Sequence, residues 1–136
     1  MRFASREIDF WELRSAEASH KANPDTFEIP SQSDLASLKR GQAARLILDI
    51  ESADENGDTQ IQGERMWVIV SECLEDAYIG ILDNQPASIE PAEDVYLCFG
   101  AEIPFTKAHV IDIGNPPTEY VEWQLKQKPE RIWPRS

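Results

Sequence analysis

Two strand-like segments around one short turn fill residues 61–86, and this run constrains the fold more than any other part of the chain. In the first segment, apolar side chains at positions 66–70 alternate between both faces, which is typical of a central strand. A turn at Glu75 and Asp76 leads to the second segment at residues 78–82, where Gly80 indicates a bulge or sharp bend. The run contains no catalytic motif, so its recognisable residues indicate a scaffold.

A further strand and a tight turn are predicted just before this run. Residues 44–51 alternate apolar and polar side chains with a period of two, as a half-buried strand does. Asn56 and Gly57 follow, and because these residue types readily adopt positive φ, the segments on either side should form an antiparallel hairpin. Two more strands are predicted at residues 95–99 and 109–113. We therefore expect an α+β fold in which a strongly bent antiparallel sheet, or a small SH3-like barrel, has about five strands with helices outside it.

Helices are predicted before and after these strands in the sequence. An amphipathic pattern predicts a helix at residues 5–20, before Pro24. Ser31 and Asp34 have the spacing of a capping box and predict a brief helical turn. Residues 118–128 predict the last helix, with apolar side chains four positions apart on one face.

The length of 136 residues fits one domain. Within it we expect an N-terminal helical extension at residues 1–30, a β core at residues 31–113, and a C-terminal helix and tail at residues 114–136. Trp133 in the tail either packs back on the domain or stays available to a partner.

The charge of the chain is strongly acidic: 25 acidic against 13 basic side chains give a formal net charge of -12. This imbalance makes attraction to phosphate backbones or anionic lipids unfavourable, so we expect neither nucleic acid nor membranes as partners. A basic protein surface would be attracted instead. The alternative is that the acidic surface only keeps the protein in solution.

Cys73 and Cys98 lack the CxxC spacing of a zinc site and are too few for a disulfide framework. We expect buried, reduced thiols in a cytoplasmic protein, with a cross-strand disulfide as the alternative. Charged residues interrupt the N-terminal segment too early for a signal peptide, and no apolar stretch is long enough to span a membrane.

Catalytic and metal-binding patterns are sparse. His20 and His109 are the two histidines, and His109 has a potential partner in Asp112, but no nucleophile accompanies them. Residues 54–58 (DENGD) resemble the first half of a calcium loop, yet the glycine comes before its required position and the final glutamate is missing. We therefore predict no enzyme activity, no metal and no cofactor.

Two binding surfaces are candidates. The first is an acidic hairpin tip that steers a partner, together with exposed tryptophans as apolar anchors; its residues are Asp54, Glu55, Asp58, Trp123 and Trp133. The second is a polar groove with aromatic walls for a peptide or small ligand; its residues are Glu64, Arg65, Trp67, Asp83, Asn84 and His109.

Three segments resemble the YegJ-like family of small bacterial proteins of unknown function: ERMWV at 64–68, GILDNQP at 80–86 and FTKAHVIDI at 105–113. The similarity covers roughly residues 35–113 and implies a compact α+β fold in a bacterial protein, with no catalytic residue to carry over. Small acidic bacterial proteins without catalytic motifs are also typical of immunity proteins, an analogy at the level of protein class. The leading hypothesis is therefore a binding module, an immunity protein that covers the basic active site of a toxin. The alternative is a small-ligand-binding or regulatory module.

Overall fold

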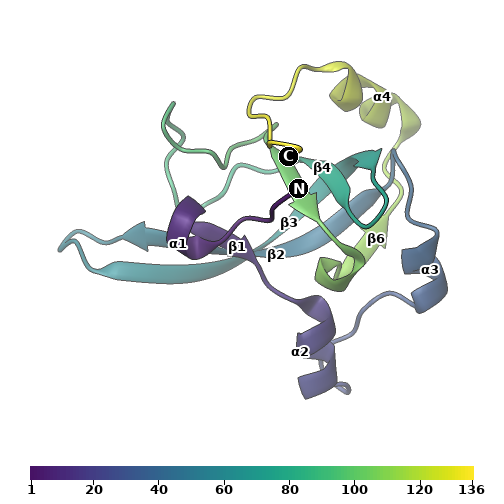
Figure 1. Ribbon diagram of the computed structural model, residues 1–136, viewed down its shortest axis with the longest axis horizontal. Coiled ribbons are helices and arrows are strands. Elements are labelled where there is room, and N and C mark those ends of the chain that lie inside the picture. Colours follow the sequence, from purple (N-terminus) through teal and green to yellow (C-terminus); the bar gives the residue numbers. More distant parts are fainter.

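The computed structural model describes residues 1–136 and contains one antiparallel sheet that curls into a half-barrel (Figure 1). Its strands are β1 (Trp11–Leu13), β2 (Ala43–Ala53), β3 (Thr59–Cys73), β4 (Tyr78–Leu82), β5 (Glu102–Phe105) and β6 (Asp112–Gly114). The strands from β1 to β5 are hydrogen-bonded in sequence order. After β5, a 3-10 turn, η1 (Lys107–His109), brings the chain back so that β6 pairs with β2 beyond the end of β1. The predicted α+β fold with a strongly bent antiparallel sheet is confirmed.

The β2–β3 hairpin is the longest feature of the sheet. Its register runs without interruption from Ala43 opposite Ile69 to Ala53 opposite Thr59, as the turn signal in the sequence predicted. Of the two turn residues, Gly57 has positive φ (82°), whereas Asn56 does not. The end of the hairpin projects well beyond the rest of the molecule (Figure 1).

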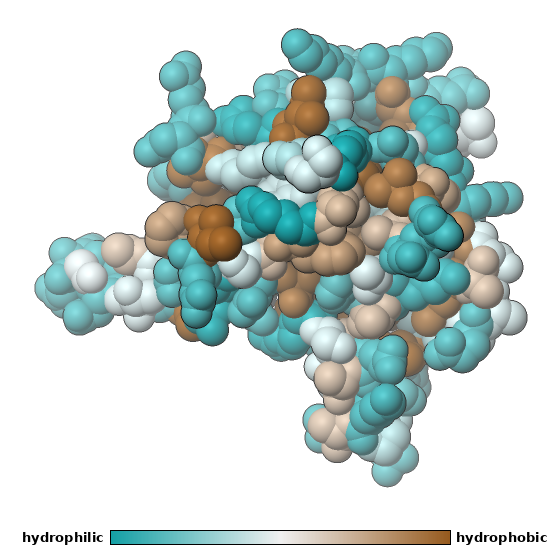
Figure 2. All heavy atoms as spheres, in the orientation of Figure 1, coloured by the Kyte–Doolittle hydropathy of each residue, from teal (hydrophilic) through white to brown (hydrophobic).

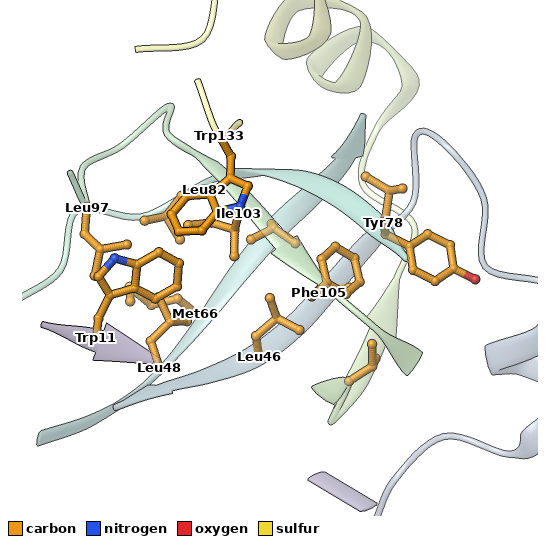
Figure 3. Packing of buried hydrophobic residues seen from close by; sticks show 14 of the residues in the cluster. Trp11, Leu46, Leu48, Met66, Tyr78, Leu82, Leu97, Ile103, Phe105 and Trp133 are labelled. Atoms are coloured by element: carbon orange, nitrogen blue, oxygen red, sulfur yellow. The ribbon is translucent and has the colours of Figure 1, made fainter. Parts of the chain in front are cut away.

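The concave face of the sheet holds the main core, a cluster of 17 buried residues. Along β3 the side chains from Met66 to Val70 alternate as predicted, with Met66, Val68 and Val70 on this face. The aromatic side chains Trp11, Phe105 and Trp133 come from three distant parts of the chain and all belong to this core (Figure 3). The N-terminal segment, the β strands and the C-terminal tail therefore share one core.

The convex face is covered in part by α4 (Thr118–Lys126), which packs Val121 and Leu125 against Ala43 and Ile69. The last helix was predicted at residues 118–128; it begins at Thr118 as predicted and ends two residues earlier, and its apolar residues four positions apart form the packed face. α3 (Gln32–Ala36) also begins as predicted, because the Ser31 hydroxyl accepts a hydrogen bond of 3.1 Å from the Asp34 N–H.

The predicted helix at residues 5–20 is wrong. The segment forms α1 (Arg6–Asp9), then strand β1, then α2 (Ala16–Ala22). Phe10 ends α1 in the left-handed region at φ 66°, and β1 then pairs with β2, with Trp11 opposite Ile50. Residues 1–30 are therefore not a helical extension, because three of them complete the edge of the sheet.

The predicted strand at residues 95–99 is also wrong: this segment is irregular, and the strand lies at Glu102–Phe105 instead. Pro104 is tolerated there because β5 is an edge strand, where a missing N–H costs no ladder hydrogen bond on the free side. At residues 109–113, the strand is confined to β6, and His109 belongs to η1. The bend predicted at Gly80 appears on the partner strand, where the register shifts between Val70 and Glu72.

Both thiols are free, and the alternative of a cross-strand disulfide is not realised. Cys73 is exposed at the end of β3 and Cys98 is half-buried in the irregular segment, so the prediction of two buried thiols is wrong. None of the helices has the length and apolar character needed to cross a bilayer.

Candidate functional site

The tip of the β2–β3 hairpin is ordered by one of its own acids. The carboxylate of Asp54 accepts backbone hydrogen bonds from Asn56 (2.8 Å) and Asp58 (2.9 Å), and a longer one from the Gln60 amide (3.4 Å). Such bonds hold the turn in a single conformation. The N–H of Asp58, helped by that of Asn56, keeps the pKa of Asp54 below its usual value, because these bonds favour the ionised form.

The other two predicted acids at this tip face the solvent. Glu55 and Asp58 are exposed, and neither carboxylate makes a hydrogen bond or ion pair within the chain. The three acids thus divide into one that builds the turn, Asp54, and two that are free to meet a partner.

The two predicted tryptophan anchors have different positions. Trp123 on α4 is 50% exposed, and Phe99 beside it is 40% exposed; together they line a hollow of about 250 Å³ next to the end of α4. Trp133, by contrast, is 2% exposed and lies in the core, so it is no exposed anchor. The hairpin tip and α4 lie at opposite ends of the molecule (Figure 1), and they do not form one surface.

The predicted polar groove is partly assembled at the end of β4. The backbone N–H of Trp67 donates to the side-chain oxygen of Asn84 at 3.1 Å, and Asp83 accepts hydrogen bonds from Tyr120 and from Gln124 at 3.1 Å. Burial, helped by the bond to Asp83, raises the pKa of the Tyr120 hydroxyl to about 12. These contacts attach α4 to the end of β4, and an open hollow of about 290 Å³ remains beside Trp67 and Asp83.

Glu64 does not belong to this groove. Its carboxylate accepts hydrogen bonds from the backbone N–H groups of Ala87 (2.8 Å) and Ser88 (3.0 Å), and from the Ser88 hydroxyl. Burial opposes ionisation of Glu64, but these bonds outweigh it and hold its pKa below the usual value. Glu64 therefore fixes the loop that follows β4.

His109 is also separate from the groove. Its Nδ1 accepts a hydrogen bond of 3.0 Å from the Thr106 N–H and thereby caps η1, while its ring lies edge-on to Phe3 at 6.0 Å. Burial lowers the pKa of the ring, so the neutral form that can accept this bond is favoured. Asp112 instead accepts from the N–H of Ile113, and the pairing of His109 with Asp112 is not formed.

Arg65, the remaining groove residue, lines a different and larger cleft on the convex face. This cleft has a volume of about 480 Å³ and lies between the segment that connects α2 to α3 and the strands β2, β3 and β6. Arg45 and Phe27 also line it, and sequence reasoning missed both. The sequence offered one indication of this cleft, a charged residue at position 45 in the period-two pattern of β2. Such a residue is equally expected on a face that is simply solvated.

Metal-binding geometry is absent: nowhere do three or more His, Cys, Asp or Glu side chains gather in a way that could hold a metal ion. Comparison of the chain with protein-family models, with curated protein sequences and with solved structures finds no match. The resemblance to the YegJ-like family therefore stays a prediction, and the function has to be argued from the geometry.

Proposed function

We propose that this chain is a non-enzymatic protein-binding module that docks on a basic surface of a partner through the end of its β2–β3 hairpin. One observation supports this most directly: the hairpin extends beyond the core and is exposed on both faces, with two acids at its tip that no group of the chain neutralises. The surface of this projection is mainly polar (Figure 2).

The edge of the hairpin adds a second contact mode. β4 pairs with β3 only from Val68 to Cys73, so residues 59–63 have β2 on one side and no strand on the other. All five of these residues are exposed, and Ile61 among them is a large apolar side chain at 50% exposure. A free strand edge can accept an extended segment of another protein through backbone hydrogen bonds.

The tip is also prepared for fast association. Because Asp54 already orders the turn, little conformational entropy is lost when Glu55 and Asp58 meet a partner. The net charge of -12 steers the whole molecule toward a positive surface, and this steering acts mainly on the association rate.

The finer form of the proposal is that the partner is a toxin whose basic active site the hairpin covers, so that the chain acts as an immunity protein in the cytoplasm. A nuclease is a natural example of such a partner, because an enzyme that binds phosphate backbones needs a basic surface. The acidic tip would occupy the place of the substrate.

The experiment begins with the immobilised full-length chain, which is used to capture proteins from a lysate of the organism that encodes it, with washes of increasing salt. A stoichiometric partner with a basic domain is then purified, and its association rate is measured with the wild type and with the double variant Glu55→Lys, Asp58→Lys. We expect association to slow on the order of tenfold and to lose most of its salt dependence.

The matched control is Glu119→Lys with Glu122→Lys on α4, two exposed acids whose reversal changes the net charge by the same amount at the opposite end. If both double variants slow association equally, the overall charge acts and the hairpin is not the docking site. If the purified partner has no toxic activity that the chain suppresses, the immunity form fails while the docking proposal stands.

A further inference from the structure

We propose that the cleft between the α2–α3 connection and the convex face of the sheet binds a carboxylate through Arg45 and Arg65, with an apolar side chain of the same ligand packed beside them. The ligand class is an amino acid with an apolar side chain or the C-terminal residue of a peptide. This site is distinct from the hairpin tip and does not depend on the docking proposed above.

The two arginines differ from all the others in the chain. Every other arginine donates a hydrogen bond to a carboxylate or to a backbone carbonyl; these are Arg2, Arg6, Arg14, Arg40, Arg131 and Arg135. Arg45 and Arg65 have no hydrogen-bond acceptor and no carboxylate within ion-pair distance, although the chain carries 25 acidic residues. Both line the same cleft.

Arg45 carries the stronger signal because part of its guanidinium is buried. Its Nε is shielded from solvent and has no hydrogen-bond partner. A buried donor that has lost its water without gaining an acceptor costs free energy, so such groups need an explanation. An acceptor supplied by a ligand would remove this cost.

The sheet places the two guanidinium groups for joint binding. Arg45 on β2 lies opposite Trp67, and Arg65 on β3 lies opposite Ile47, so the arginines are diagonal neighbours on one face. Diagonal neighbours are about 7–8 Å apart at the backbone, within reach of two long side chains that converge on one anion.

Aromatic rings fix the orientation of both side chains. The guanidinium carbon of Arg45 is 5.8 Å from the centre of the Trp67 ring, and that of Arg65 is 5.8 Å from the centre of the Phe27 ring. Contacts of this kind hold a guanidinium in place but accept none of its classical hydrogen bonds, so its N–H donors remain available for the two oxygens of a carboxylate.

The rest of the lining narrows the ligand class. Asp25, Glu28, Asp34 and Asp112 surround the cleft and repel anions of higher charge, which disfavours phosphate and nucleotides. A single carboxylate is better tolerated, and the acids can accept N–H donors from the same ligand. Ile29, Ile111 and Ile113 supply the apolar surface for its side chain.

The test uses the full chain labelled with ¹⁵N, with the Nε–Hε resonances of the arginines followed by NMR. The probes are N-acetyl-alanyl-leucine, its C-terminal amide, free leucine and inorganic phosphate. We expect the acetylated dipeptide or free leucine to shift the Arg45 and Arg65 resonances in a saturable manner, and which of the two does so distinguishes a peptide end from a free amino acid. The C-terminal amide should cause no shift.

Variants complete the experiment. Arg45→Gln and Arg65→Gln should each weaken binding of the shifting probe by about tenfold or more, because each removes charge-assisted hydrogen bonds. Arg40→Gln, outside the cleft, should leave binding unchanged. Since neither cleft arginine has a hydrogen-bond or ion-pair partner in the chain and each variant gives up only an aromatic contact, both variants should unfold within a few degrees of the wild type.

Three results would overturn the proposal. One is the absence of any shift for both carboxylate probes at tens of millimolar. Another is equal binding of the amide and the acid, which would mean that the carboxylate is not recognised. The third is tighter binding of phosphate than of either carboxylate.

Discussion

The indole N–H of Trp133 donates a hydrogen bond of 2.9 Å to the backbone carbonyl oxygen of Arg2, which joins the C-terminal tail to the N-terminal segment. The guanidinium of Arg2 lies over the same ring, 4.4 Å from its centre. On its other sides the indole packs edge-on against Trp11 and Tyr96, with ring centres 5.8 and 5.4 Å away. The tail therefore closes one side of the core.

Truncation of this side chain should be among the most destabilising single changes. We expect Trp133→Ala to lower the free energy of unfolding by about 3–5 kcal/mol, because it removes a large aromatic group from a packed core and leaves a cavity. Urea denaturation followed by circular dichroism measures the change. Trp123→Ala is the control, and since that ring is half exposed, its loss should be about 1 kcal/mol or less. Similar values for the two variants would show that the tail does not pack in solution.

Glu102 should make stability depend on pH in the acid range. Its carboxylate, 6% exposed, accepts hydrogen bonds from the Trp133 N–H (2.9 Å) and from two nitrogens of Arg135 (2.8 and 2.9 Å). Burial opposes its ionisation, but the bonds from Arg135 and Trp133 outweigh burial and lower the pKa of Glu102 below its usual value of 4.5. As the pH falls, the unfolded chain takes up this proton first. The stabilisation is therefore complete above about pH 4.5 and is lost as the pH falls through the folded pKa.

Glu102→Gln should cost about 1–3 kcal/mol at pH 7 and should flatten the acid limb of the stability curve. The measurement is a series of urea titrations between pH 7 and pH 3. Glu72→Gln removes the exposed carboxylate that pairs with the same Arg135, and it should cost about 1 kcal/mol or less. If Glu72→Gln flattens the acid limb as much as Glu102→Gln does, burial of Glu102 has no role.

Gly80 should not tolerate a side chain. A Cβ at this position would lie 2.5 Å from Cγ2 of Val68 and 3.2 Å from the ring of Phe105, inside the packed core. We expect Gly80→Ala to destabilise the protein by about 1–3 kcal/mol through overpacking. Gly114→Ala is the matched control, since its Cβ would meet the Trp67 ring at an ordinary 3.4 Å. Thermal unfolding of both variants decides the point, and a neutral Gly80→Ala would contradict the close approach of β3 and β4.

Asp54 should control the order of the hairpin tip without affecting the core. Asp54→Ala removes the acceptor for the N–H groups of Asn56 and Asp58, so these two amides should exchange with solvent faster by about tenfold, while the amides of Val68 and Leu82 keep their protection. Hydrogen exchange followed by NMR measures both sets in one sample. Glu55→Ala leaves these bonds intact and should change neither set.

The parts of the fold that follow local rules could be predicted from the sequence. The β2–β3 hairpin is set by a period-two pattern and a turn glycine, and α4 by apolar residues four positions apart. The N-terminal segment could not be predicted in this way, because its amphipathic pattern fits a helix equally well. The left-handed conformation of Phe10 and the pairing of Trp11 with Ile50 decide it, and both depend on the tertiary structure.

The two candidate sites also differ in how far the sequence predicts them. The acidic tip is contiguous in the sequence, so its acids could be named in advance, although the internal role of Asp54 could not. The cleft could not be predicted, because Phe27, Arg45 and Arg65 come from three separate segments. Its distinguishing property is that the two arginines have no hydrogen-bond or ion-pair partner, and only the folded structure reveals that.

The β2–β3 hairpin joins two regions that respond differently to mutation. Substitutions near Leu46 or Val68 disturb the core, whereas the side chains of residues 59–62 are exposed and belong to no packed cluster. During evolution the outer half of the hairpin can therefore accumulate changes at little cost in stability. A lineage could acquire a new partner by altering these few positions while the same sheet is retained beneath them.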